Sequence, residues 1–88
     1  MHYVKQAEYI DGYRVTLTFE DGNVKIIDLL PYLEGEVFEP LKNPNYFKDF
    51  KVDFDADTIV WPNGADFSPD FLYEKGQSYL TGNEQKFG

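Results

Sequence analysis

The segment at residues 11–22 reads DGYRVTLTFEDG, and the fold prediction starts from it. Apolar and polar side chains alternate along it, which is typical of a β-strand with one buried face. An Asp-Gly pair stands at each end, and hairpin turns need residues that tolerate positive φ. The segment therefore predicts a central strand at 13–20 between antiparallel neighbours at 2–10 and 23–29.

The third predicted strand contains a carboxylate among apolar residues. Val24 and Ile26 are expected to continue the buried face of the central strand, while Ile27 and Leu29 point to the other side. Asp28 lies between them. It is either a buried carboxylate whose raised pKa would suit acid–base chemistry or, as we favour, a residue that bonds nearby backbone where the strand ends.

The second half of the chain predicts a second hairpin. Phe50, Val52 and Phe54 alternate with polar residues and indicate the apolar face of a strand. A turn at 55–57 would connect this strand to a return strand at 58–61. Before the hairpin, residues 37–41 fit either a turn of helix or an extended segment.

Two short helices flank the predicted hairpin. The first is expected over 44–48, because Asn43 can cap a helix and the proline after it is tolerated in the first turn. The second should begin after Ser68, a second capping residue, and stop by Gly76. The fold class is therefore α+β: a mainly antiparallel sheet, built from a three-strand meander plus a second hairpin, with two short helices.

Composition limits the possible functions. The 88 residues include one Trp, seven Tyr and eight Phe, enough for one core in a domain at 1–76, and residues 77–88 form a polar tail expected to fray. There is no cysteine, which excludes disulfides and thiolate chemistry. The net charge of −8 opposes direct contact with nucleic acid or anionic membranes. With no signal or spanning segment, a cytoplasmic location is expected.

Catalytic motifs are scarce. His2 is the one histidine and is expected on an exposed edge strand, whereas Ser68 is predicted to cap a helix and Ser78 lies in the tail. A serine–histidine mechanism is therefore not expected. The chain has no phosphate-binding loop or cofactor motif, so we expect no cofactor and no enzymatic activity.

Three aspartates have the spacing found at the start of a calcium-binding loop. Asp53, Asp55 and Asp57 have the D-x-D-x-D pattern, but that loop needs glycine at its sixth position and glutamate at its twelfth. Thr58 and Gly64 stand there instead. We therefore expect no metal site, and the three carboxylates are predicted to share a solvent-facing side of the hairpin.

The most distinctive motif is WPNGAD at residues 61–66. In the structural interpretation, which we favour, Trp61 covers the core, Asn63 forms the turn and Asp66 bonds exposed backbone N–H groups. In the functional interpretation, Trp61, Asn63 and Asp66 line a small ligand pocket.

These motifs resemble a bacterial family of domains of unknown function, number 2442. The resemblance covers about residues 1–76, with similar stretches at 13–19, 21–22, 28–29, 37–42, 46–47, 52–53, 61–66 and 69–73. Phe67 replaces the leucine expected there. The resemblance implies a small α+β domain and no assigned activity. Some members carry a helix-turn-helix after this domain, and others are encoded beside a second small protein, as toxin–antitoxin pairs are. From its length, we expect this chain to be of the stand-alone type.

Three functional hypotheses follow. The first is a non-enzymatic interaction module, such as an antitoxin-like protein, that binds a small basic partner through Asp53, Asp55, Asp57 and Trp61. The second is a small-ligand sensor or minor enzyme with a pocket at 61–66. The third is self-association through the edge strand at 2–10, which would make the protein a weak homodimer rather than a monomer.

Overall fold

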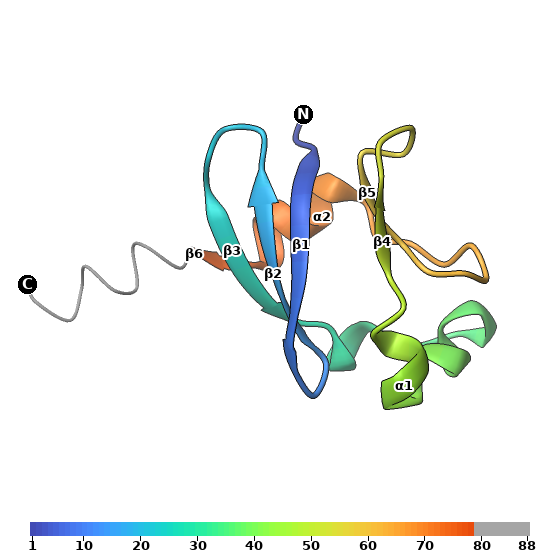
Figure 1. The fold of residues 1–88 in the computed structure, drawn as a ribbon. Coiled ribbons are helices and arrows are strands. Elements are labelled where there is room, and N and C mark those ends of the chain that lie inside the picture. Colours follow the sequence, from blue (N-terminus) through green and yellow to red (C-terminus); the bar gives the residue numbers. More distant parts are fainter. Residues whose placement is uncertain (79–88) are drawn as a thin grey trace, which may run out of the picture.

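A computed structural model describes residues 1–78 of the chain as an α+β fold (Figure 1). The elements are β1 (Val4–Asp11), β2 (Arg14–Phe19), β3 (Val24–Asp28), the 3-10 helices η1 (Leu30–Tyr32) and η2 (Glu36–Lys42), α1 (Pro44–Phe47), β4 (Lys51–Asp53), β5 (Thr58–Val60), α2 (Pro69–Lys75) and β6 (Gln77–Ser78). One antiparallel sheet has the strand order β1-β2-β3-β6, and β4 and β5 form a separate hairpin. The predicted fold class is confirmed.

The last strand begins inside the segment predicted to fray. Gln77 and Ser78 of β6 pair with Ile26 and Lys25 of β3, so the main sheet extends two residues beyond the expected boundary at 76. The remainder of the predicted tail, residues 79–88, lies outside the described residues. Within residues 1–78, each helix is too short to cross a membrane.

The buried face of β3 differs from the prediction. Ile27 and Leu29 are buried and Val24 and Ile26 only half-buried, the reverse of the expected arrangement. The β2–β3 turn is the cause: the N–H of Phe19 donates to the carbonyl of Asn23, so three residues, not the two of the Asp-Gly pair, form the loop. One extra loop residue shifts the register by one and moves each β3 side chain to the opposite face.

Both predicted helix caps are present. The Asn43 side chain accepts the N–H of Asn45 at 2.9 Å, and Ser68 Oγ accepts the N–H of Phe71 at 3.4 Å. Each satisfies a backbone donor that the first helical turn leaves without a partner. The undecided segment before α1 is helical, because residues 37–41 lie within η2.

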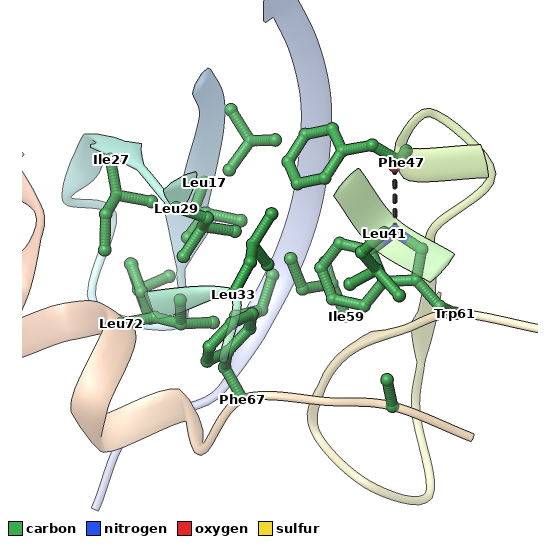
Figure 2. Close-up of a cluster of buried hydrophobic side chains, with 14 residues drawn as sticks. Leu17, Ile27, Leu29, Leu33, Leu41, Phe47, Ile59, Trp61, Phe67 and Leu72 are labelled. Atoms are coloured by element: carbon green, nitrogen blue, oxygen red, sulfur yellow. Dashed lines mark hydrogen bonds between the residues drawn. The ribbon is translucent and has the colours of Figure 1, made fainter. Parts of the chain in front are cut away.

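Trp61 connects the hairpin to the rest of the core (Figure 2). Its side chain is 2% exposed, and its indole N–H donates to the carbonyl of Phe47 at 2.8 Å. The Phe47 ring also contacts Tyr9 and Tyr13, which lie near the turn between β1 and β2. Trp61 also contacts Phe67 at nearly a right angle, and the Phe67 ring stacks on that of Phe71 in α2. The structural interpretation of Trp61 as a core residue is confirmed.

Phe54 does not join the apolar face predicted for its strand. β4 ends at Asp53, and Phe54 is the first residue of the four-residue turn that follows. Its side chain is 73% exposed, more than that of any other Phe, Tyr or Trp in the described part of the chain. The prediction that these residues share an apolar face is therefore confirmed for Phe50 and Val52 and wrong for Phe54. The turn begins at Phe54, earlier than expected.

Replacing Trp61 by Phe is expected to lower the free energy of unfolding by about 2–3 kcal/mol, because the change leaves a void and removes the hydrogen bond to the buried Phe47 carbonyl. Urea denaturation followed by circular dichroism measures the change. Phe54→Leu, at an exposed aromatic, is the control and should cost less than about 0.5 kcal/mol. Equal losses in the two variants would contradict the role given to Trp61.

Candidate functional site

An open groove of about 590 Å³ runs along the β4–β5 hairpin. Its lining residues are Asp49, Lys51, Val52, Asp53, Phe54, Asp55, Val60, Trp61 and Pro62. We call this surface the hairpin groove. Three carboxylates and one ammonium group line it, and all four of these charged residues are exposed. The groove therefore combines an apolar floor with an excess of negative charge.

The hairpin groove unites candidates from two different motifs. Trp61, from WPNGAD, lies in the same groove as Asp53 and Asp55, from the aspartate series. The third aspartate of that series, Asp57, does not line the groove. It is half-buried at the end of the turn with a φ of 62°, and its carbonyl accepts the N–H of Val4.

Asn63 and Asp66 also lie outside the hairpin groove. The Asn63 amide group donates to the carbonyl of Val37 at 2.9 Å, and its oxygen accepts the N–H of Ala65 at 3.1 Å. Asp66 is exposed and lies opposite Val60 in an isolated antiparallel bridge. The polar groups of Asn63 are thus used in shaping the loop, and neither Asn63 nor Asp66 lines the hairpin groove that Trp61 lines.

Asp53 both lines the hairpin groove and builds its turn. Its Oδ1 accepts the N–H groups of Asp55 and Ala56 at 2.8 and 3.2 Å. Side-chain acceptors of this kind are the usual way in which aspartate starts a turn. Only Asp53 lies within β4, so the expected row of three carboxylates on one strand face is not formed.

The idea of a buried Asp28 is wrong. Its side chain is exposed and accepts the N–H of Leu30 at 3.1 Å, which is the backbone role that the sequence favoured. β3 ends at this residue, and a carboxylate there is free to turn towards water. Asp28 lines a smaller hollow of about 240 Å³ together with Arg14 and Lys75.

The described chain matches one protein family over most of its length. The family described as protein of unknown function (DUF2442) matches residues 4–78. The chain belongs to family 2442. No curated protein and no solved structure matches this family 2442 chain.

Sequence reasoning missed a second group of side chains in this family 2442 domain. His2 is half-buried rather than exposed, it precedes β1 rather than lying within it, and its ring stacks on that of Tyr73 with centroids 3.5 Å apart. His2 Nδ1 lies 3.2 Å from Glu20 Oε2, and the Tyr73 hydroxyl donates to Asp21 Oδ2 at 2.6 Å. We call His2, Glu20, Asp21 and Tyr73 the N-terminal cluster.

Hydrogen bonds keep the carboxylates of the N-terminal cluster ionised. The Tyr73 hydroxyl and the backbone N–H of Asn23 donate to Asp21 and lower the pKa of its carboxyl to about 2. The N–H of Tyr3 donates to Glu20 and likewise lowers the pKa of that carboxyl. The hydrogen bond to Asp21 in turn raises the pKa of Tyr73.

The low pKa of Asp21 predicts a specific response to acid. A carboxyl group with a lower pKa in the folded state stabilises the fold above its unfolded pKa of about 3.9. That contribution is lost as the pH falls towards the folded value of about 2. Tyr73→Phe removes the main donor, so the pKa of Asp21 should rise, and stability should change less between about pH 4 and pH 2. Carbon-13 NMR titration of the carboxyl groups, with acid unfolding in parallel, measures both effects.

Tyr32→Phe is the control for Tyr73→Phe, because it removes a hydroxyl group from a tyrosine outside the N-terminal cluster and keeps the ring. It should leave the titration of Asp21 unchanged. An Asp21 titration that is the same in Tyr73→Phe as in the wild-type protein would show that Tyr73 does not set this pKa.

Proposed function

We propose that this protein is a non-enzymatic interaction module whose hairpin groove binds a basic segment of a partner protein. The observation that carries the proposal is Phe54, an aromatic side chain 73% exposed on the rim of a groove with three carboxylates. Exposed aromatic residues of this kind often supply much of the binding energy of protein interfaces.

The charges of the hairpin groove indicate the chemistry of the partner. Asp49, Asp53 and Asp55 outnumber Lys51, and the whole chain carries a net charge of −8. Complementary charge speeds association and disfavours acidic competitors. A segment with Lys or Arg beside an aromatic or aliphatic anchor would place the anchor against Phe54 and its charges near the carboxylates. In this proposal the partner is a small basic protein, which this protein neutralises as an antitoxin neutralises its toxin.

The chemistry of the hairpin groove also favours binding over catalysis. Its carboxylates are exposed, whereas acid–base catalysis near neutral pH usually depends on burial that raises the pKa of a carboxyl group. The groove is lined by no serine, threonine or histidine that could act as a nucleophile or base.

A second candidate function is the binding of a small cationic ligand. A volume of about 590 Å³ falls within the usual range of small-molecule pockets, and Trp61 in its lining is the one tryptophan of the chain. The open shape of the groove and the exposed Phe54 fit an extended peptide better. Titration of Trp61 fluorescence with small organic cations distinguishes this candidate from the first.

Selection of peptides from a random displayed library against the purified protein tests the proposal. The enriched peptides should be basic and contain an aromatic or large aliphatic residue. Phe54→Ser should weaken binding of the best peptide by roughly 30-fold or more, the loss typical of an interface hot spot. Because Phe54 is exposed, the variant should fold normally, which circular dichroism verifies.

Neutralising charge gives an independent readout. Replacing Asp49, Asp53 and Asp55 by Asn should slow association with the peptide at low salt, and the effect should fade as salt rises. The matched control replaces Glu8, Glu34 and Glu36 by Gln, which removes the same charge from exposed positions outside the groove. Neutral or acidic selected peptides, or equal on-rates in the two triple variants, would contradict the proposal.

A further inference from the structure

The N-terminal cluster places three metal-ligating side chains together on one side of the main sheet. His2, Glu20 and Asp21 each offer a ligand atom, and these atoms all lie within 4.8 Å of one another. Within residues 1–78 this is the one such group of three. It is a mixed set of imidazole and carboxylates, which differs in chemistry from the acidic surface elsewhere.

The topology of the sheet produces this cluster. Val4 at the start of β1 pairs with Phe19 at the end of β2, so the residues before β1 lie beside those after β2. The backbone N–H of Glu20 donates to the carbonyl of Tyr3, which fixes that juxtaposition. Figure 1 shows the N-terminus and the β2–β3 turn at the same end of the sheet.

We propose that His2, Glu20 and Asp21 form a binding site for a divalent transition-metal ion of the zinc type. Zinc bonds of about 2.0–2.2 Å at tetrahedral angles place neighbouring ligand atoms roughly 3.4 Å apart. His2 Nδ1 and Glu20 Oε2, at 3.2 Å, already have this spacing. Only Asp21 must approach, and the turn that carries it is adjacent to Glu20.

The surroundings of the three ligands resemble the outer shell of metal sites. The His2 ring stacks on Tyr73 with an interplanar angle of 4°, which fixes the imidazole plane, and the His2 backbone N–H donates to Asp70. Tyr73 and Asn23 orient the Asp21 carboxylate by hydrogen bonds. Outer partners of this kind orient ligands and raise metal affinity.

The ligand types select the metal. Imidazole with carboxylates suits zinc and neighbouring transition metals, whereas Ca²⁺ and Mg²⁺ prefer oxygen ligands alone. The side chains of His2 and Glu20 are 30% and 25% exposed, so water can reach the site. Three protein ligands leave a fourth position for that water.

The wild-type protein provides the first test, because His2 is its one histidine. The protein should carry no polyhistidine tag. One equivalent of Zn²⁺ should shift the nitrogen-15 resonances of the His2 ring, and the same concentration of Ca²⁺ should not. Ring signals that stay unchanged in excess Zn²⁺ would overturn the proposal without any variant being needed.

Isothermal titration with Zn²⁺ then assigns the ligands. Binding with a stoichiometry of one should weaken more than about 10-fold in His2→Gln and in Glu20→Gln, and roughly 10–100-fold in Tyr73→Phe, which removes an outer partner. The paired variant Asp53→Asn with Asp55→Asn is the control and should bind as the wild type does. Zinc binding that survives in Glu20→Gln but is lost in the control would assign the ion to the acidic hairpin and overturn the proposal.

Discussion

The hydrogen bond from the buried Trp61 indole to the Phe47 carbonyl holds the end of the β4–β5 hairpin against α1, and the Phe47 ring in turn contacts Tyr9 and Tyr13 of the β1–β2 hairpin. The β4–β5 hairpin is a separate two-stranded sheet, and two strands alone are marginally stable in water. The hairpin is stable because Ile59 and Trp61 are buried against the same core that the main sheet covers. One edge of Trp61 also lines the hairpin groove, so the interaction that holds the hairpin also fixes the position of the groove.

The aromatic residues of the core and the exposed Phe54 differ sharply in burial. The core contains the almost fully buried Trp61, Phe47 and Phe19. The rings of Phe67 and Phe71 stack on each other. The side chain of Phe54, by contrast, is largely exposed to solvent. A single exposed apolar residue is common on protein surfaces. Phe54 is unusual because it lies beside a groove and among carboxylates, at a place where burying its ring would be favourable.

The sequence predicted local features well and long-range ones poorly. The alternation of the central strand, the caps at Asn43 and Ser68, and the core position of Trp61 are all present. The register of β3 depends on one loop residue that Asp-Gly does not specify. The N-terminal cluster joins His2 to Glu20 across 18 positions and Asp21 to Tyr73 across 52, and no local pattern encodes such contacts. Asp53, Asp55 and Trp61 were identified as candidates, but only the fold shows that they share a groove.

One backbone hydrogen bond joins the start of β1, next to the N-terminal cluster, to the turn of the β4–β5 hairpin. The N–H of Val4, two residues after His2, donates to the carbonyl of Asp57, which ends the turn that Phe54 begins. Asp57 has a positive φ of 62°, a conformation that is uncommon for non-glycine residues but that aspartate tolerates in turns. An ion bound at His2 would therefore lie two residues from the donor of the hydrogen bond that holds the end of this turn. Since linkage is reciprocal, any free energy by which the ion stabilises this turn is also the free energy by which a partner bound at the turn would favour binding of the ion.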